Sequence, residues 1–165
     1  MNIVVLAGGT STERDISILT STKVCESLRR NGHNANMIDV FLGSDKYDNV
    51  QDFFNDKNDL EELASELGKM SPKIKEIETE RKEKSEGFFG PMVLDVCKAA
   101  DIVYIGLHGS NGEDGKIQAA FDLFGIKYTG TDYLSSAISM DKHLTKKMLA
   151  TEGVPVPKGI TLKKG

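Results

Sequence analysis

The sequence predicts an α/β fold with a parallel sheet, and three observations lead to that class. Two short apolar runs, Ile3–Leu6 and Ile102–Leu107, have the nearly continuous hydrophobicity of strands that are buried on both faces. A glycine-containing loop follows each run. Apolar residues at helical spacing come next in both cases. A chain that repeats strand, loop and helix in this order is typical of right-handed parallel units.

The N-terminal part of the chain supplies the first such unit. A strand over Asn2–Leu6 is followed by a helix, predicted from about Asp15 to Arg30, which Asn31-Gly32 ends. The apolar residues of 37–40 predict a second strand. The order strand, helix, strand is the beginning of a parallel sheet.

The segment 43–90 has a different character. Its first half contains a modest amphipathic helix around residues 60–67. Ser71-Pro72 provides an N-cap and first-turn pair for a further helix, which has only Ile74 and Ile77 as apolar residues up to position 81. Such a helix is usually solvated or mobile, which we favour, or it leans on a partner subunit. Nothing in this segment suggests catalysis.

Further elements follow Pro91, which opens a helix that leads into the strand at 102–107. The next helix ends at Gly125, and residues 126–129 predict a short strand. Asp132 can cap another helix, and a second helical stretch ends at Glu152-Gly153. Beyond an extended proline-containing linker, residues 160–162 alternate like the start of a new strand, so we expect the sequence to be one piece of a longer protein.

Length, composition and net charge limit the number of domains and the kinds of molecule that the protein can bind. The 165 residues suit one domain, or one domain plus part of another, and 39% apolar with 28% charged residues is globular. A net charge of −4 argues against nucleic acid or an anionic membrane as the main partner. No apolar run is long enough to span a bilayer, and no basic segment precedes a cleavable apolar one. We therefore expect a cytoplasmic protein.

The two cysteines, Cys25 and Cys97, fall on the apolar faces of predicted helices. Buried free thiols are favoured over a disulfide between them. The sequence has no C-x-x-C pair or histidine cluster that would suggest a metal site, so no metal-binding residue is predicted.

The loop after the first strand, Gly8–Arg14, is suited to a ligand. Its two glycines let the backbone approach a ligand closely, although the loop matches neither the dinucleotide fingerprint nor the P-loop. Glu13 lies near the helix start, where it could cap the helix or point into a cleft and bind a substrate ammonium group. In the simpler alternative, Arg14 is a surface charge.

The loop after the later strand, His108–Gly115, contains three glycines, one histidine and two carboxylates. His108 stands where ligands of open α/β sheets bind, and it could orient a carboxylate or acyl group, or merely cap the loop. For Glu113 and Asp114 we favour scaffolding, because carboxylates in glycine-rich loops often accept backbone N–H bonds. Lys142, between two helical stretches, could be a solvated lysine or could reach the phosphates of a nucleotide.

Four motifs together resemble the D-alanine–D-alanine ligases of the ATP-grasp superfamily. They are Gly8-Gly9-Thr10-Ser11-x-Glu13-Arg14, His108-Gly109-x-x-Gly112-Glu113-Asp114-Gly115, Tyr128-Thr129-Gly130 and Ser139-Met140-Asp141-Lys142. The resemblance covers residues 1 to about 42 and about 93 to 162. The intervening insertion, at about 43–90, matches nothing comparable.

The resemblance implies a Rossmann-like N-terminal domain over 1–131 and, over 132–165, the beginning of a central ATP-grasp domain. It also implies a cytoplasmic, ATP- and Mg²⁺-dependent enzyme of peptidoglycan precursor synthesis, commonly a homodimer through this domain. In such enzymes ATP phosphorylates the carboxylate of a first D-alanine, and the amine of a second attacks the acyl phosphate.

Site residues follow by the same resemblance. Glu13 would hold the ammonium group of the first D-alanine, and His108 would orient that D-alanine. Ile16 would form an apolar wall, and Lys142 would contact the ATP phosphates. The other family residues, including the acidic Mg²⁺ ligands, would lie beyond residue 165, so the chain alone is expected to be inactive.

Two rival interpretations stay open. The chain could be a complete, non-catalytic α/β module that dimerises or binds a small amino acid. It could also be a flavodoxin-like domain for a phosphorylated ligand, which would explain Gly8-Gly9 but would give no joint role to Glu13 and His108.

Overall fold

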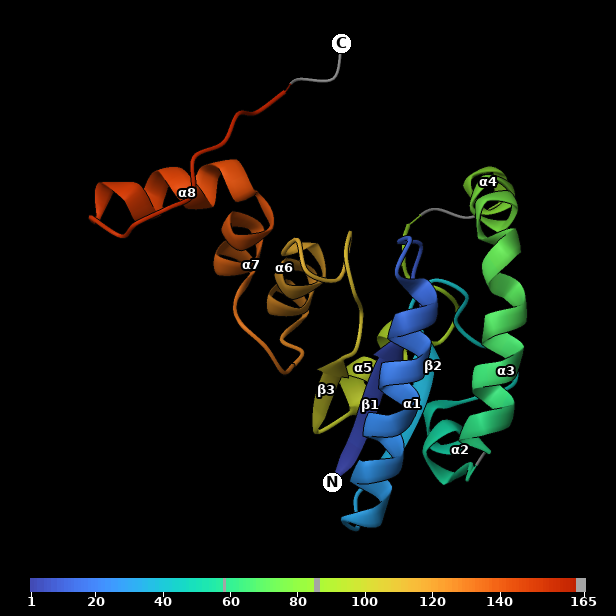
Figure 1. The fold of residues 1–165 in the computed structure, drawn as a ribbon. Coiled ribbons are helices and arrows are strands. Elements are labelled where there is room, and N and C mark those ends of the chain that lie inside the picture. Colours follow the sequence, from blue (N-terminus) through green and yellow to red (C-terminus); the bar gives the residue numbers. More distant parts are fainter. Residues whose placement is uncertain (58, 85–86, 163–165) are drawn as a thin grey trace.

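A three-stranded parallel sheet with helices on both faces forms the body of the protein (Figure 1). The computed structural model describes residues 1–57, 59–84 and 87–162. The strand order is β2-β1-β3, so that β1 is central. The described elements are β1 (Asn2–Ala7), α1 (Arg14–Arg30), β2 (Asn34–Asp39), α2 (Val50–Asn55), α3 (Leu60–Met70), the 3₁₀ turn η1 (Ser71–Lys73), α4 (Ile74–Lys84), α5 (Val93–Ala99), β3 (Ile102–Ile105), α6 (Lys116–Phe124), α7 (Tyr133–Met140) and α8 (Lys142–Thr151). The predicted α/β class is confirmed.

The central strand β1 is buried along almost its whole length, as its apolar run predicted. Its register pairs Val5 with Met37 of β2 and with Tyr104 of β3, both in parallel. Strand β3 is less covered than predicted, because only Val103 of its four residues is fully buried. The strand pairing is therefore as expected, but the second apolar run lies nearer the edge of the molecule than the first.

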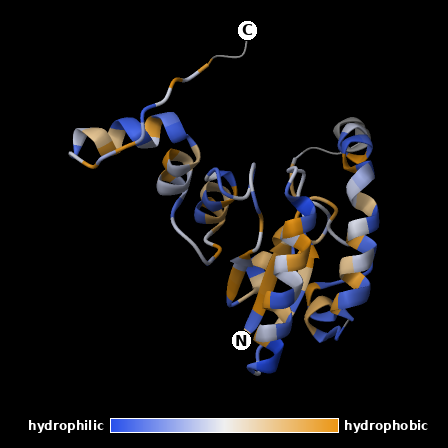
Figure 2. Ribbon diagram, viewed as in Figure 1, coloured by the Kyte–Doolittle hydropathy of each residue, from blue (hydrophilic) through white to orange (hydrophobic). Residues whose placement is uncertain are grey.

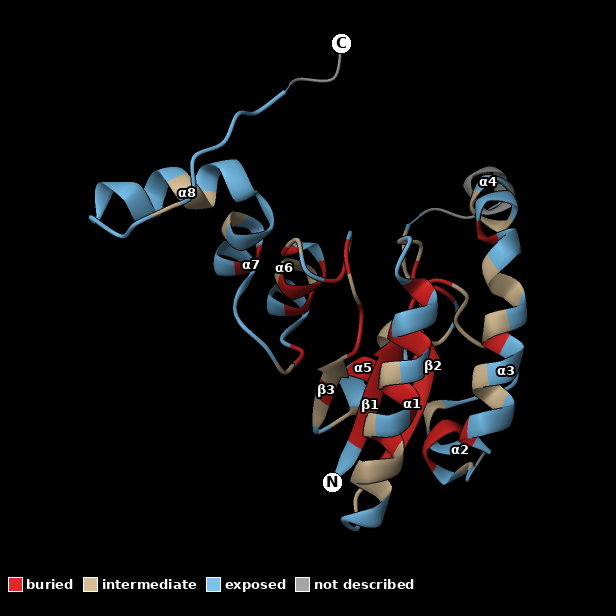
Figure 3. Ribbon diagram, in the orientation of Figure 1, coloured by how far each residue is buried: buried red, intermediate tan, exposed pale blue. Residues whose placement is uncertain are grey.

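Alternate residues of β1 contribute to two separate cores. Ile3 and Val5 pack with apolar residues of α1 and α3 on one face of the sheet. Val4 and Leu6 pack with α5, α6 and α2 on the other. Hydrophobic residues accordingly concentrate in the sheet and in the inner sides of these helices (Figure 2), and the buried positions follow the same distribution (Figure 3). This is a three-layer α/β arrangement.

The segment 43–90 adds α2, α3, η1 and α4 beside β2 and α1, while its residues 58, 85 and 86 lie outside the described part. Asp59 caps α3 by accepting hydrogen bonds from the N–H groups of Glu61 and Glu62. The start of α4 is anchored, since Ile74 is buried and Ile77 packs on the core. We expected this helix to be solvated, and that expectation is wrong at its first turn.

The part of the chain after α6 carries α7 and α8, as the capping pattern predicted. The Asp132 carboxylate accepts a hydrogen bond from the Ser135 N–H and so caps α7. Two predicted strands are not formed in full. Residues 126–129 make only a single parallel bridge, between Tyr128 and Val103, and residues 154–162 have no regular structure. Within the described part of the chain, the sheet consists of β2, β1 and β3, and residues 160–162 pair with none of these strands.

Candidate functional site

The junction of β1 and β3 is the point where the strand order reverses. The chain passes from β1 to β2 on one side and later crosses over to β3 on the other. Ligands of open α/β sheets bind at such switch points, outside the carboxyl ends of the strands. Both loops predicted to carry function, the β1–α1 loop (8–13) and the β3–α6 loop (106–115), leave the sheet at this edge (Figure 1).

These two loops are in direct contact. The Ser11 hydroxyl donates a hydrogen bond of 2.7 Å to the main-chain carbonyl of His108. A Cβ added at Gly109 would lie 3.0 Å from Oε2 of Glu13, so the Glu13 carboxylate lies against this glycine. The structure therefore brings the loop of Glu13 and the loop of His108 together, although they are far apart in the sequence.

Glu13 occupies the N-cap position of α1, but its carboxylate makes no capping bond. Its N–H is instead hydrogen-bonded to the Ser11 hydroxyl, at 3.2 Å. The side chain is exposed beside the β3–α6 loop. The structure therefore contradicts the helix-cap interpretation of Glu13 and places its carboxylate against Gly109.

The β3–α6 loop is stiffened by its own carboxylates, as predicted for Glu113 and Asp114. Glu113 Oε2 accepts a hydrogen bond of 2.8 Å from the Gly109 N–H, and Asp114 accepts one of 3.0 Å from the Asn111 N–H. Burial acts to raise the pKa of Asp114, but hydrogen bonds from the Lys116 side chain and the Asn111 N–H outweigh it and hold that pKa below its usual range. His108, half-buried, begins a pre-shaped loop.

Arg14 is not a surface charge, and that alternative is wrong. Its side chain is 4% exposed and pairs with the fully buried Asp39 at the end of β2, Nη1 to Oδ2 2.5 Å. It also donates to the main-chain carbonyl of Gly9, at 2.9 Å. Arg14 therefore ties the β1–α1 loop to the end of the neighbouring strand. The sequence gives no sign of this, because Asp39 looks like an ordinary strand-end residue.

Ser17 and Ser21 join α1 to the same edge of the sheet. The Ser17 hydroxyl accepts from the Gly8 N–H at 3.0 Å and donates to the Gly106 carbonyl at 2.7 Å. The Ser21 hydroxyl donates to the Leu6 carbonyl at 3.2 Å. The sequence analysis predicted neither these anchors nor Ser11. A signal for Ser17 and Ser21 is that they are hydroxyl residues on the otherwise apolar face of α1, whereas Ser11 lies in the loop before the helix and has no such signal.

Lys142 is the first residue of α8 and is exposed; its Nζ donates to the Ser139 carbonyl at 2.7 Å. It lines a hollow of about 370 Å³ that also includes Gly112 and Glu113 of the β3–α6 loop. The β3–α6 loop therefore has two neighbours. Its Gly109 contacts the Glu13 carboxylate, and its Gly112 and Glu113 line the hollow that Lys142 also lines. Glu13 and His108 do not line this hollow among the described residues.

Ile16 lies one turn along α1 from Glu13, and its side chain is 55% exposed. The structure leaves it uncovered at the surface, where it could provide an apolar wall.

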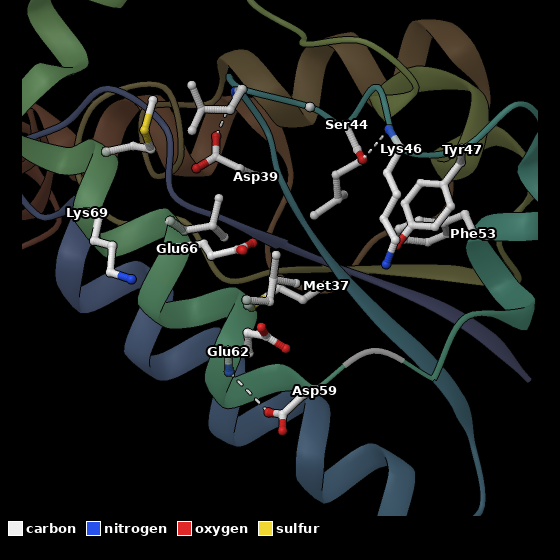
Figure 4. A pocket seen from close by; sticks show the side chains of 16 residues that line it. Met37, Asp39, Ser44, Lys46, Tyr47, Phe53, Asp59, Glu62, Glu66 and Lys69 are labelled. Atoms are coloured by element: carbon white, nitrogen blue, oxygen red, sulfur yellow. Dashed lines mark hydrogen bonds between the residues drawn. The ribbon is translucent and has the colours of Figure 1, made fainter.

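A second cavity, of about 810 Å³, lies between β2, α3 and the 42–47 loop (Figure 4). Its rim is charged, but Lys46 is already paired with Asp56, Nζ to Oδ2 2.7 Å, and Asp59 is used as a helix cap. It contains none of the residues predicted to bind a substrate or nucleotide. The candidate site is therefore the β1–β3 edge.

Metal-ligand geometry is absent from the described part of the chain, which holds no group of three or more His, Cys, Asp or Glu side chains suited to an ion. In the same residues, no helix combines the length and the hydrophobicity that crossing a bilayer requires.

Known proteins resemble this chain closely. A D-alanine–D-alanine ligase from Lacticaseibacillus casei is 43% identical over 155 residues, which are 93% of this chain and 43% of the relative. A ligase of the same name from Fusobacterium nucleatum is 34% identical over 158 residues, 96% of this chain and 39% of the relative. The chain thus spans less than half the length of these relatives.

The structural comparison agrees. The crystal structure of a D-alanine–D-alanine ligase from Bacillus anthracis in complex with ATP superposes with a TM-score of 0.59 at 26% identity, over 96% of this chain and 39% of that one. The family model described as the D-ala D-ala ligase N-terminus matches residues 2–131. This chain belongs to the D-alanine–D-alanine ligase N-terminal domain family.

Proposed function

We propose that the chain is the N-terminal part of an ATP-dependent ligase that joins two D-alanine molecules for peptidoglycan precursor synthesis. In that reaction the γ-phosphoryl group of ATP is transferred to a carboxylate oxygen of the first D-alanine, with release of ADP. The amine of the second D-alanine then attacks the acyl carbon, phosphate leaves, and the amine loses a proton. The names of the relatives and the resemblance of the four motifs support this assignment.

Glu13 and His108 would bind the first D-alanine. The exposed Glu13 carboxylate offers an ammonium group a charge-assisted hydrogen bond, which is about twice as strong as a neutral one. His108 would orient the carboxylate of the same molecule, with Ile16 as an apolar wall. The contact between Glu13 and Gly109 is the observation that best supports this proposal, because Gly109 directly follows His108 in the chain.

Lys142 would contact the phosphates of ATP. It is exposed at the first position of α8, where its ammonium group could pair with a phosphate. The first-turn N–H groups of His143 and Leu144 are already bonded to the Asp141 carboxylate, so the proposed contact depends on the Lys142 side chain. By the family resemblance, the acidic Mg²⁺ ligands would belong to the part of the enzyme beyond residue 165.

The domain arrangement is part of the same proposal. Residues 1–131 would form the substrate-side domain, and residues 132–165 would begin the central ATP-grasp domain. The whole enzyme would be cytoplasmic and would form a homodimer through the N-terminal domain.

The test uses the polypeptide encoded when the reading frame is followed beyond Gly165. It should release phosphate from ATP only when D-alanine is present and should form the dipeptide. Glu13→Gln should raise KM for the first D-alanine by about tenfold or more, since it removes the charged partner of the ammonium group. Glu61→Gln, which changes an exposed glutamate on α3, is the control and should leave KM unchanged.

If Glu13→Gln leaves KM for the first D-alanine unchanged, Glu13 does not bind the ammonium group and has only a structural role. A reading frame with no ATP-grasp continuation would favour the non-catalytic module instead. The 165-residue chain alone should be inactive, and D-alanine-dependent phosphate release by the purified chain would contradict that.

A further inference from the structure

The peptide group between His108 and Gly109 is held from both sides by side chains of two different elements. Its carbonyl oxygen accepts a 2.7 Å hydrogen bond from the Ser11 hydroxyl. Its N–H donates a 2.8 Å hydrogen bond to the Glu113 carboxylate. Ser11 belongs to the β1–α1 loop and Glu113 to the far side of the β3–α6 turn. We call these two bonds the peptide clamp.

A clamp at these two atoms fixes an orientation. The six atoms of a peptide group lie in one plane, so holding the oxygen and the N–H sets the rotation of that plane. The plane begins at the Cα of His108, and its rotation is the ψ angle of His108. The clamp therefore restricts the main-chain geometry from which the His108 side chain projects.

The same hydroxyl also acts on Glu13. Ser11 Oγ accepts the Glu13 N–H at 3.2 Å while it donates to the His108 carbonyl. One oxygen atom thus links the main chain of both proposed substrate-binding residues. Gly109 has φ +68° and no side chain, and an added Cβ would be 3.3 Å from Ser11 Cβ, so these two loops meet closely at this point.

We propose that Ser11 and Glu113 are positioning residues that set the relative placement of Glu13 and His108. This inference rests on the proposed function for its catalytic consequence, but the clamp itself can be tested without it. Neither residue needs to touch a substrate. Their effect on catalysis runs through the backbone of the residues that do.

The kinetic test compares substitutions that keep or remove each hydrogen bond in the full-length enzyme. Ser11→Ala should raise KM for the first D-alanine by about tenfold, the equivalent of one lost hydrogen bond, and should leave KM for ATP unchanged. Ser11→Thr keeps a hydroxyl and should be close to wild type. Ser110→Ala removes an exposed serine hydroxyl from the same loop and is the matched control.

Glu113 provides the second half of the test. Glu113→Ala should raise the same KM, whereas Glu113→Gln retains an oxygen acceptor and should restore most of the loss. Ser11→Ala and Glu113→Ala should be non-additive when combined, because both act on one peptide group. Additive effects, or a loss in kcat with KM for the first D-alanine unchanged, would overturn a positioning role.

Hydrogen exchange in the 165-residue chain separates this inference from the proposed function. Glu113→Ala should speed the exchange of the Gly109 amide. Ser11→Ala should speed it as well, although Ser11 does not touch that amide, because the whole peptide group is loosened. If the full-length wild type has no ligase activity, the proposed function fails while this readout still decides the clamp. Unchanged Gly109 exchange in Ser11→Ala would overturn it.

Discussion

Arg14 and Asp39 form a buried ion pair that joins the start of α1 to the end of β2. The Nη1 and Oδ2 atoms are 2.5 Å apart, and the two side chains are 4% and 0% exposed. The second oxygen of Asp39 accepts the N–H groups of Phe41 and Leu42, at 2.8 and 2.9 Å. The pair therefore fixes three pieces of backbone at the edge of the sheet that carries the candidate site.

Removal of one partner of this pair should be costly. Arg14→Met leaves the Asp39 carboxylate buried without its cation, which typically costs about 3–5 kcal/mol. Urea denaturation of the 165-residue chain should show a correspondingly lower free energy of unfolding. Arg30→Met, at an exposed position of the same helix, is the control and should change it little. A loss in Arg14→Met as small as in the control would mean that the pair is unimportant for stability.

Gly8 allows this pair to form. An added Cβ at Gly8 would lie 1.8 Å from Asp39 Oδ2, and the residue has φ +75°. Gly32 has a similar φ of +80° but no atom within 4 Å of an added Cβ. Gly32→Ala should therefore cost only the left-handed backbone strain of about 1–2 kcal/mol. Gly8→Ala should cost clearly more, as measured by thermal unfolding; equal losses would contradict the close contact.

The cysteines should be unreactive in the folded chain. Burial raises the pKa of Cys25 to about 11 and that of Cys97 to about 12, and both thiols are free. Because the thiolate is the reactive species, an aromatic disulfide reagent at pH 8 should modify both slowly in buffer and rapidly in denaturant. Fast modification of either thiol in buffer would indicate an opening of the core around it.

Asp114 should make its loop sensitive to acid. Its pKa lies below the ordinary value of 3.8 in the folded chain, so its contribution to stability is present above that value and is lost as the pH falls through the lowered pKa. Carboxyl NMR titration should find its midpoint below the usual range. In Lys116→Ala the midpoint should rise, because the hydrogen bond from the lysine side chain is gone. An unchanged midpoint would assign the shift to the backbone N–H groups alone.

Local patterns predicted much of this fold because the relevant forces act within a few residues. The apolar run at Ile3–Leu6, the stop at Gly125 and the cap at Asp132 each depend on neighbours in sequence. The two loops could also be placed together, since parallel strands end at one edge of the sheet. The helix stop and the cap needed no knowledge of distant contacts, whereas the meeting of the loops followed from the parallel pairing of β1 and β3.

The remaining features depend on contacts with residues that are distant in the sequence, and no local pattern identifies those residues. The burial of Arg14 is decided by Asp39, and the anchoring of α4 is decided by the core around Ile74. The strand predicted at 160–162 is not formed, and these residues pair with none of the strands in the described part of the chain. In the candidate site, the Glu13 and His108 loops were predictable by motif, whereas the hydroxyl of Ser11 between them was not.

The packing around Gly106 limits which residues position 106 can accept. A methyl group there would lie 2.1 Å from the hydroxyl oxygen of Ser21 and 2.8 Å from the carbonyl of Leu6. A library that randomises position 106 alone should therefore return only glycine among stable clones. A library that varies positions 106 and 21 together should give the same result, because any side chain at position 106 would still clash with the Leu6 carbonyl oxygen. Where α1 crosses the sheet, there is therefore space for the Ser21 hydroxyl but not for a side chain at position 106.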